Sequence, residues 1–146
     1  KRTDGGVYRL VYKNDSTAVE LGLEWREQYL YVELFRLVNG EIRDNPIIIG
    51  QKSKLTAFNL EDLVEIRAPH KAIDSESWTT PLTLRSVDHI LRRYSELLSK
   101  FAADVLVGDF RVFPRLEAKV KSRLQSAAAP RQRAKEAARI QTGAVS

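Results

Sequence analysis

The feature that most constrains the fold is a regular apolar repeat between residues 84 and 105. Seven apolar residues recur there at alternating spacings of three and four: Leu84, Val87, Leu91, Tyr94, Leu98, Phe101 and Val105. Because these spacings return to one face of an α-helix, they predict an amphipathic helix of about six turns, roughly 35 Å long. Ile90 and Leu97 widen the stripe, which favours packing against a sheet or another helix over a narrow coiled-coil seam. Gly108 is the expected C-terminal cap.

The first third of the chain has the pattern of β-strands. Residues 17–25 alternate between apolar and polar or small side chains, and this period of two is typical of a half-buried strand. Residues 7–12 form a shorter run of β-type residues. Residues 29–38 are apolar on both faces, which favours a central strand. These three runs predict three neighbouring strands.

A tight turn follows the third run. Asn39 and Gly40 both tolerate the positive φ that a type I′ hairpin turn requires. A returning strand is therefore expected at Ile42 and then over residues 47–49, with an interruption near Pro46 that suits an edge position or a bulge. The result is an antiparallel meander of about four strands.

Helical signals dominate the rest of the chain. A short helix is expected over residues 60–67, with Asn59 as its N-cap and Asp62 as a weak capping-box partner. Pro69 ends this helix, and the mostly polar residues 70–82 connect it to the long one.

A further helix is expected after the long one. Pro114 suits a first helical turn, and an apolar edge follows it, formed by Leu116, Val120 and Leu124. Core-forming residues are almost absent beyond this edge, and Pro130 is expected to interrupt the helix.

Together these elements predict an α+β fold. An antiparallel sheet of about four strands packs on one face against the long amphipathic helix, with a short helix before it and a basic helix after it. We expect one domain over residues 1–125 and a basic, Ala-rich tail over residues 126–146 that is flexible or helical.

Positive charge is concentrated at the C-terminal end of the chain. The 146 residues hold 24 Lys and Arg against 19 Asp and Glu, which gives a formal net charge of +5. Residues 1–110 contain 15 basic and 17 acidic side chains, whereas residues 111–146 contain nine basic and two acidic ones. Any phosphate-binding role therefore belongs to the nine: Arg111, Arg115, Lys119, Lys121, Arg123, Arg131, Arg133, Lys135 and Arg139.

Two interpretations of this basic segment stay open. It can bind nucleic acid through phosphate contacts, with the salt dependence that counterion release imposes. It can instead be a solvated helix whose cations complement the helix dipole. No aromatic residue follows Phe113 to stack on bases, and no helix-turn-helix or zinc-finger spacing accompanies the charge, so the solvated helix is favoured.

Sequence motifs for catalysis, metals or cofactors are missing. The chain has no cysteine, only two histidines, and neither a nucleophile elbow nor a phosphate-binding glycine loop. We therefore predict no catalytic residue, no metal ligand and no cofactor. One alternative is a metal-dependent hydrolase in which Glu20, Glu24 and Glu33 gather on neighbouring strands, but the solvated face of a sheet explains these carboxylates more simply.

An aromatic and acidic surface is expected on the sheet. Aromatic residues are concentrated in the first three strands, in greater number than one sheet face needs for a core. Tyrosine, tryptophan and arginine are the residues that dominate interface hot spots. The candidate interaction residues are Glu20, Glu24, Trp25, Arg26, Tyr29, Tyr31 and Glu33.

These features favour a non-catalytic protein-binding module over an enzyme. Small bacterial accessory proteins, immunity proteins and adaptors among them, use similar layouts, which is an analogy of architecture alone. The expected partner is another protein, nucleic acid binding through the basic segment is the first alternative, and the metal-dependent hydrolase is the second. Self-association through an uncovered part of the long apolar stripe is a further alternative. No membrane-spanning run or signal peptide is visible, so a cytoplasmic location is expected.

Overall fold

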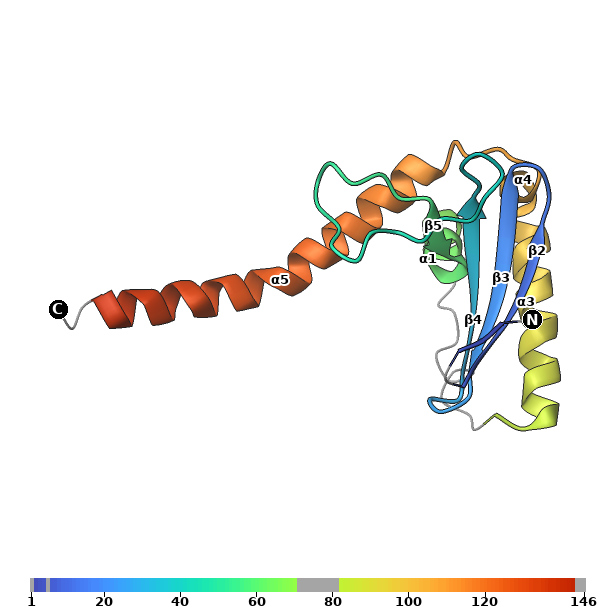
Figure 1. Cartoon of the computed structure of the whole chain (residues 1–146), viewed down its shortest axis with the longest axis horizontal. Helices are drawn as coiled ribbons and strands as arrows, with labels where there is room; N and C mark the ends of the chain where they lie inside the picture. Colours follow the sequence, from blue (N-terminus) through green and yellow to red (C-terminus); the bar gives the residue numbers. More distant parts are fainter. Residues whose placement is uncertain (1, 5, 71–81, 144–146) are drawn as a thin grey trace.

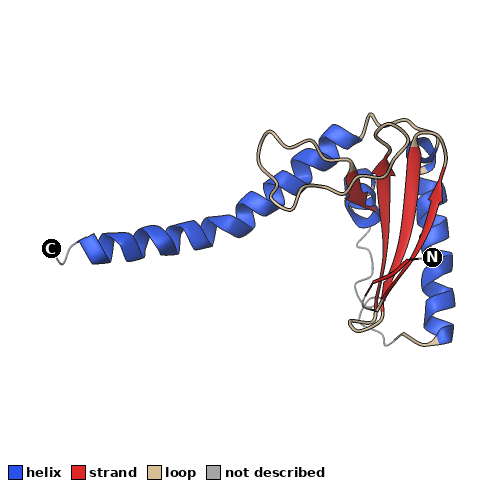
Figure 2. Ribbon diagram, in the orientation of Figure 1, coloured by secondary structure: helices blue, strands red, loops and turns tan. Residues whose placement is uncertain are grey.

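The computed structural model describes residues 2–4, 6–70 and 82–143 and shows an antiparallel sheet followed by helices (Figures 1 and 2). Five strands form the sheet in sequence order: β1 (Arg2–Asp4), β2 (Val7–Lys13), β3 (Thr17–Glu24), β4 (Tyr29–Arg36) and β5 (Ala57–Asn59). The helices are α1 (Leu60–Arg67), α3 (Leu84–Phe101), α4 (Ala103–Leu106) and α5 (Phe113–Gly143). This arrangement confirms the predicted α+β fold, whereas most of the expected connection at 70–82 lies outside the described residues.

The three long strands occupy the runs that the sequence pattern predicts. β3 and β4 pair along their whole length, with Leu21 opposite Val32 and Leu23 opposite Leu30. Because side chains alternate across a strand, these apolar residues share one face of the sheet and the residues between them share the other. β1 is an additional edge strand that pairs with the first residues of β2.

The predicted hairpin turn at Asn39 and Gly40 is confirmed. The φ angles of these residues are 54° and 75°, as a type I′ turn requires. On either side of the turn, Val38 and Glu41 exchange two backbone hydrogen bonds of 2.9 and 3.1 Å.

The returning strand expected from Ile42 onward is wrong. The chain continues there as a loop, and β5 takes the place beside β4. The Asn45 side chain accepts hydrogen bonds from the backbone N–H groups of Thr56 and Ala57 and donates one to the Ala57 carbonyl. Side-chain bonds of this kind compete with ladder pairing, and Pro46 has no N–H to donate to a ladder.

The main core lies between the sheet and the helices, and a smaller buried cluster around Phe35 lies on the other face of the sheet. The main core combines apolar side chains from β4, β5, α1, α3, α4 and the first turns of α5, among them Val32, Leu63 and Val105, which are almost completely buried. Tyr94 on α3 also ties this helix to β4, because its hydroxyl donates a 3.0 Å hydrogen bond to the carbonyl of Leu30. Truncating such a core side chain to alanine lowers the free energy of unfolding by about 2–5 kcal/mol. Packing of this strength holds the sheet against the helices.

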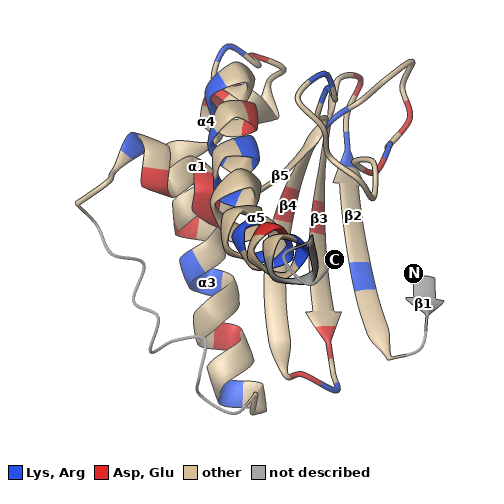
Figure 3. Cartoon of the chain, turned by 90° about the vertical axis from the view of Figure 1, so that its left-hand side faces the viewer, with Lys and Arg blue, Asp and Glu red and all other residues tan. Residues whose placement is uncertain are grey.

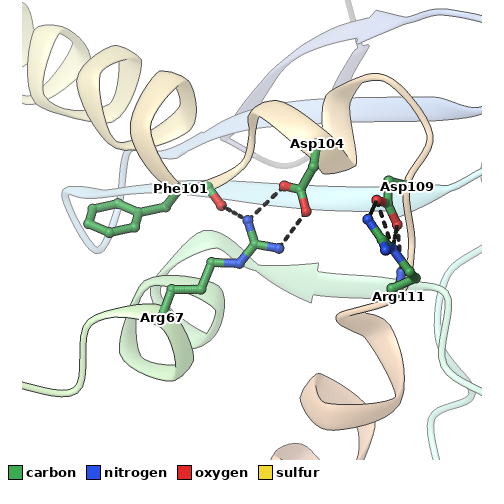
Figure 4. Close-up of polar contacts among 5 residues, drawn as sticks. All are labelled: Arg67, Phe101, Asp104, Asp109 and Arg111. Atoms are coloured by element: carbon green, nitrogen blue, oxygen red, sulfur yellow. Dashed lines mark hydrogen bonds and ion pairs between the residues drawn. The ribbon is translucent and has the colours of Figure 1, made fainter.

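The long helix ends earlier than its apolar repeat predicts. α3 stops at Phe101, and the short α4 follows after one non-helical residue. Arg67 accounts for the break, because its guanidinium donates to the Phe101 carbonyl and makes two 2.6 Å bonds to the carboxylate of Asp104 (Figure 4). The Phe101 carbonyl is the acceptor that the next helical turn would use. Gly108, with a φ of 91°, ends the segment as expected.

The short helix α1 has the predicted bounds, with Asn59 at its N-cap position, but the predicted capping contact is wrong. Asn59 precedes the helix, but its side chain makes no capping hydrogen bond. Asp62, the expected capping-box partner, is instead buried and accepts two hydrogen bonds from Arg123 on α5. A tertiary ion pair therefore replaces the local contact that the spacing predicts.

The last helix is longer than the sequence predicts. α5 begins next to Pro114, as expected, but it continues through Pro130, where a break is predicted, and its distal part extends away from the rest of the chain (Figure 1). Pro130 has no N–H to donate to the carbonyl of Ser126. Because Ser126 is exposed, water can donate a hydrogen bond to this carbonyl instead. Among the described residues, no helix is long and apolar enough to cross a bilayer.

Candidate functional site

One face of the sheet carries no helix in the described part of the chain. The helices α1, α3 and α4 stand together on the opposite side (Figure 3), and the helical residues of the apolar core pack there. We call the side without helices the helix-free face, although Ala18 and Phe35 at one end of it are buried in a small apolar cluster against which Ile42 packs. The face is formed by the side chains on β2, β3 and β4 that alternate with the core-facing ones. Its central residues are Arg9, Glu20, Gly22, Glu24, Tyr29, Tyr31 and Glu33.

Tyr31 is held in one orientation at the centre of this face. Its ring lies directly across Gly22 on the neighbouring strand, where an added Cβ atom would stand 2.0 Å from Tyr31 Cζ. Its hydroxyl donates a 3.1 Å hydrogen bond to Glu20 Oε1, and its ring stacks on that of Tyr29 at a centroid distance of 6.0 Å. Burial, followed by the charge of Glu20, raises the pKa of Tyr31, so its hydroxyl keeps its proton at neutral pH.

Two carboxylates face each other beside Tyr31. Glu20 on β3 lies directly opposite Glu33 on β4, and Glu20 is 8% exposed. Burial, together with the charges of Glu20 and Asp44, raises the pKa of Glu33 to about 7. Arg9 on β2 offsets part of the repulsion, with its Nε 3.5 Å from Glu20 Oε1. The cluster holds more carboxylates than cations, so a further cation would stabilise it.

Five of the seven predicted interaction residues lie on the helix-free face. Beyond the Glu20–Glu33 pair and Tyr31, Glu24 stands opposite Tyr29 at the end of the sheet. The other two, Trp25 and Arg26, occupy the turn that joins β3 to β4. Trp25 is 57% exposed and Tyr29 is 40% exposed, so aromatic surface is open to solvent at this end.

The three strand carboxylates do not gather around one point. Glu20 and Glu33 are directly opposite each other, but Glu24 lies four residues further along β3 and faces Tyr29. Among the residues that the structure describes, no group of three acidic or histidine side chains can hold a metal ion. The metal-dependent alternative therefore has no ligand set in this part of the chain.

Four of the nine predicted phosphate-binding cations are paired inside the protein. Their partners are all carboxylates, in the pairs Arg111–Asp109, Lys119–Glu65, Lys121–Glu117 and Arg123–Asp62. Arg123 binds both oxygens of the buried Asp62 carboxylate, at 2.8 and 3.1 Å. Lys121 also donates to two backbone carbonyls of the loop before β5. Lys119, Lys121 and Arg123 anchor the first half of α5 to the body of the protein, whereas Arg111 precedes α5 and pairs with a residue two positions away.

The other five cations are exposed on α5. Arg115 lies near its start, and four more lie in residues 126–143, which we call the projecting helix: Arg131, Arg133, Lys135 and Arg139. Arg131, Lys135 and Arg139 follow one another at spacings of four and therefore share one side of this helix. No ion pair among the described residues involves Arg131, Arg133 or Lys135.

Sequence reasoning misses two members of the helix-free face, Gly22 and Arg9, and one loop residue beside it, Asp44. Gly22 carries a usable signal, because a glycine inside a strand pattern indicates a close approach by another group. Arg9 becomes visible only when the register of β2 against β3 is known. Asp44 comes from the loop after the hairpin, whose course depends on the tertiary contacts of Asn45.

No protein-family model, no curated protein and no solved structure matches this chain.

Proposed function

We propose that this chain is a non-catalytic protein-binding module. Its docking surface is the helix-free face together with Trp25 and Arg26 in the adjoining turn. The observation that carries the proposal is the exposure of Trp25 and Tyr29 beside a cluster of partly buried carboxylates. Grouped aromatic side chains on a surface mark interaction sites, because tyrosine and tryptophan offer a large contact area with few rotatable bonds.

The centre of the docking surface is fixed before a partner arrives. Tyr31 packs on Gly22, bonds to Glu20 and stacks on Tyr29. Immobilising a flexible side chain on binding costs about 0.5–1.5 kcal/mol. Because these side chains are already held in the free protein, less of the interaction energy is lost in ordering them.

The charge of the docking surface favours a basic partner. It carries Glu20, Glu24 and Glu33, against two cations: Arg9, which pairs with Glu20, and Arg26 in the adjoining turn. Complementary charge speeds association and disfavours partners of the same sign. An arginine side chain suits this surface in two ways, because its guanidinium can pair with a carboxylate and stack on a tyrosine ring.

A photo-crosslinking residue at position 29 tests the proposal. Tyr29 is replaced by p-benzoylphenylalanine in the full chain, which is then irradiated in the cells that naturally make it. The matched control carries the same residue in place of Ser95, which is exposed on α3. We expect adducts with protein from position 29 and none from position 95. No adduct from position 29, or the same adducts from both positions, contradicts the proposal.

A second candidate function is nucleic acid binding by the projecting helix. The observation in its favour is that Arg131, Arg133 and Lys135 are exposed and form no ion pair among the described residues. The test compares retention of an oligonucleotide by the full chain and by a chain that ends after Leu124. Salt-sensitive binding that only the full chain shows supports this function, whereas equal retention by the two chains opposes it.

A further inference from the structure

Two surfaces of the described chain are complementary in chemistry, and neither is covered by a helix, although Ile42 packs over the Ala18 and Phe35 end of the first. One is the helix-free face, with its carboxylates and stacked tyrosines. The other is the projecting helix, whose residues 126–140 are exposed apart from the half-buried Ala129. Helices in proteins gain most of their stability from packing, and no residue of this segment belongs to the apolar core.

We propose that the partner of the helix-free face is a second copy of this chain, which docks its projecting helix along β3 and β4. This inference rests on the proposed function, because it names the occupant of the same docking surface. The helix cannot reach the face of its own chain, because α5 points away from it (Figure 1). Leu116, which is fully buried, and the Arg123–Asp62 pair hold the first half of α5 in that direction.

The projecting helix is long enough to cross the open part of the helix-free face. The projecting helix is roughly 27 Å long at the usual rise per helical residue. The eight-residue strands β3 and β4 are about 26 Å long at the usual rise per strand residue. Ala18 and Phe35 at one end of this face are buried beneath Ile42, so a docked helix lies over the rest of the face, from Glu20 and Glu33 to the turn at Trp25.

The charges can also be placed in register. Arg131 and Arg139 are about 12 Å apart along the helix. Glu20 and Glu24 are about 13 Å apart along β3. One end of the cationic side can thus meet the Glu20–Glu33 pair while the other end meets Glu24. The first of these contacts supplies the additional cation that the facing carboxylates lack.

Two copies can form this helix-on-sheet contact in both directions at the same time. If each copy places its projecting helix on the sheet of the other, the result is a closed dimer with two equivalent contacts around a two-fold axis. Each helix then packs one side against the sheet of the other copy. Such a dimer is held largely by charge, so it weakens as salt screens the contacts.

The test measures the mass of the full chain by analytical ultracentrifugation at low and at high salt. We expect twice the mass of the chain at low salt and loss of the dimer at high salt. A helix-reversed variant, R131E/K135E/R139E, is expected to be monomeric at both. A wild-type chain that is monomeric at low salt overturns the inference, as does a helix-reversed variant that still dimerises.

A matched control keeps the change in net charge constant. R85E/R92E/K100E reverses the same number of cations at exposed positions of α3. This control is expected to remain dimeric at low salt, and circular dichroism shows whether each variant keeps its helices. If the control also becomes monomeric, net charge and not the projecting helix governs association, and the inference fails.

Mixing two variants gives the most specific version of the test. A sheet-reversed variant, E24K/E33K, is expected to be monomeric because its own helix and its altered sheet repel each other. When it is mixed with the helix-reversed variant, both contacts of a mixed dimer join opposite charges, so a dimer is expected to return. A mixture that stays monomeric overturns the inference. The dependence of the wild-type mass on salt tests the inference without any variant.

The experiments distinguish a failure of the proposed function from a failure of this inference. If position 29 crosslinks to a different protein while the wild-type chain is monomeric, the docking surface stands and the second copy is excluded. Suppose instead that the wild-type chain is monomeric and that the helix-reversed variant loses oligonucleotide retention while the α3 control variant keeps it. The projecting helix then binds nucleic acid, and the inference is again overturned.

Discussion

The ring of Tyr31 lies so close to Gly22 that a side chain at position 22 has no room: an added Cβ atom would stand 2.0 Å from Tyr31 Cζ. The contact joins β3 to β4 at the centre of the helix-free face. An aromatic ring placed over a cross-strand glycine fills the surface that the missing side chain leaves open. The half-buried ring at the centre of the proposed docking surface is thus positioned by its contact with a cross-strand glycine.

Replacing Gly22 with alanine is expected to displace Tyr31 and to lower the free energy of unfolding by about 1–3 kcal/mol, as overpacking does. Urea denaturation measures this loss. Gly50→Ala is the matched control, because an added Cβ there meets only Ser53 Oγ at 3.9 Å, and it is expected to be nearly neutral. The double variant G22A/Y31A removes the clash, so a loss equal to the sum of the single losses would show that the contact is unimportant.

Glu33 is expected to make the stability of the monomer fall as pH rises. Its pKa is raised to about 7 in the folded chain, above the usual carboxyl value of 4.5. Between these two values the folded state holds more protons than the unfolded state, so unfolding becomes easier as pH increases and levels off above 7. We expect a loss of about 1–2 kcal/mol after allowance for solvent screening.

The comparison of wild type with Glu33→Gln isolates this effect from the other titrating groups. Urea denaturation at a series of pH values, at protein concentrations that keep the chain monomeric, should show a smaller decline between pH 4.5 and 7 in the variant. Identical pH profiles for the two proteins would mean that Glu33 has an ordinary pKa.

Association is expected to depend on pH in the opposite direction. The groups around Glu33 are Glu20, Asp44, Arg9 and Tyr31, and among them only Arg9 is a cation. A docking guanidinium favours the ionised form of Glu33, so docking releases a proton and the dimer strengthens as pH rises toward 7. Sedimentation at pH 6 and pH 8 measures the change. A dimer that weakens over this interval contradicts the placement of the cation beside Glu33.

The cations of α5 are expected to divide into two groups when each is replaced by alanine. Arg123→Ala leaves the buried Asp62 carboxylate without its bidentate partner and should lower the free energy of unfolding by about 1–3 kcal/mol. Arg131→Ala removes an exposed side chain and should change the stability of the monomer by less than about 0.5 kcal/mol. Chemical denaturation of both variants at high salt checks this, and equal losses would contradict the division.

Arg67 is expected to matter for the end of α3. Its guanidinium holds the Phe101 carbonyl and the Asp104 carboxylate, and its hydrogen bonds lower the pKa of Asp104 (Figure 4). Arg67→Ala should lower the free energy of unfolding by about 1–3 kcal/mol, because the Phe101 carbonyl and the Asp104 carboxylate lose the guanidinium that donates to them. Arg92→Ala breaks an exposed pair with Asp88 and should cost less than about 0.5 kcal/mol. Similar losses in the two variants would show that the Arg67 contact is dispensable.

Local patterns in the sequence predict most of the elements. The alternation over residues 17–25, the turn at Asn39 and Gly40, and the apolar repeat that begins at Leu84 all correspond to observed structure. Each of these signals depends on neighbours within a few residues, so the sequence alone carries them.

Long-range contacts decide what the sequence could not predict. Asn45 draws β5 to the edge of β4 in place of the expected strand, and Arg67 ends α3 from a different helix. In the candidate site, the acidic and aromatic residues could be placed on one face by alternation. The contact between Tyr31 and Gly22 requires the register of two strands, and the Arg123–Asp62 pair joins residues 61 positions apart.

The most direct test of the central claim compares backbone amide NMR spectra of the wild-type chain and the helix-reversed variant, R131E/K135E/R139E, at low salt. If the projecting helix of a second copy lies on the helix-free face, the amide signals of Gly22, Tyr31 and Glu33 should shift between the two proteins. Signals on the outer side of α3 should stay in place. Shifts confined to residues 126–143 would contradict the claim.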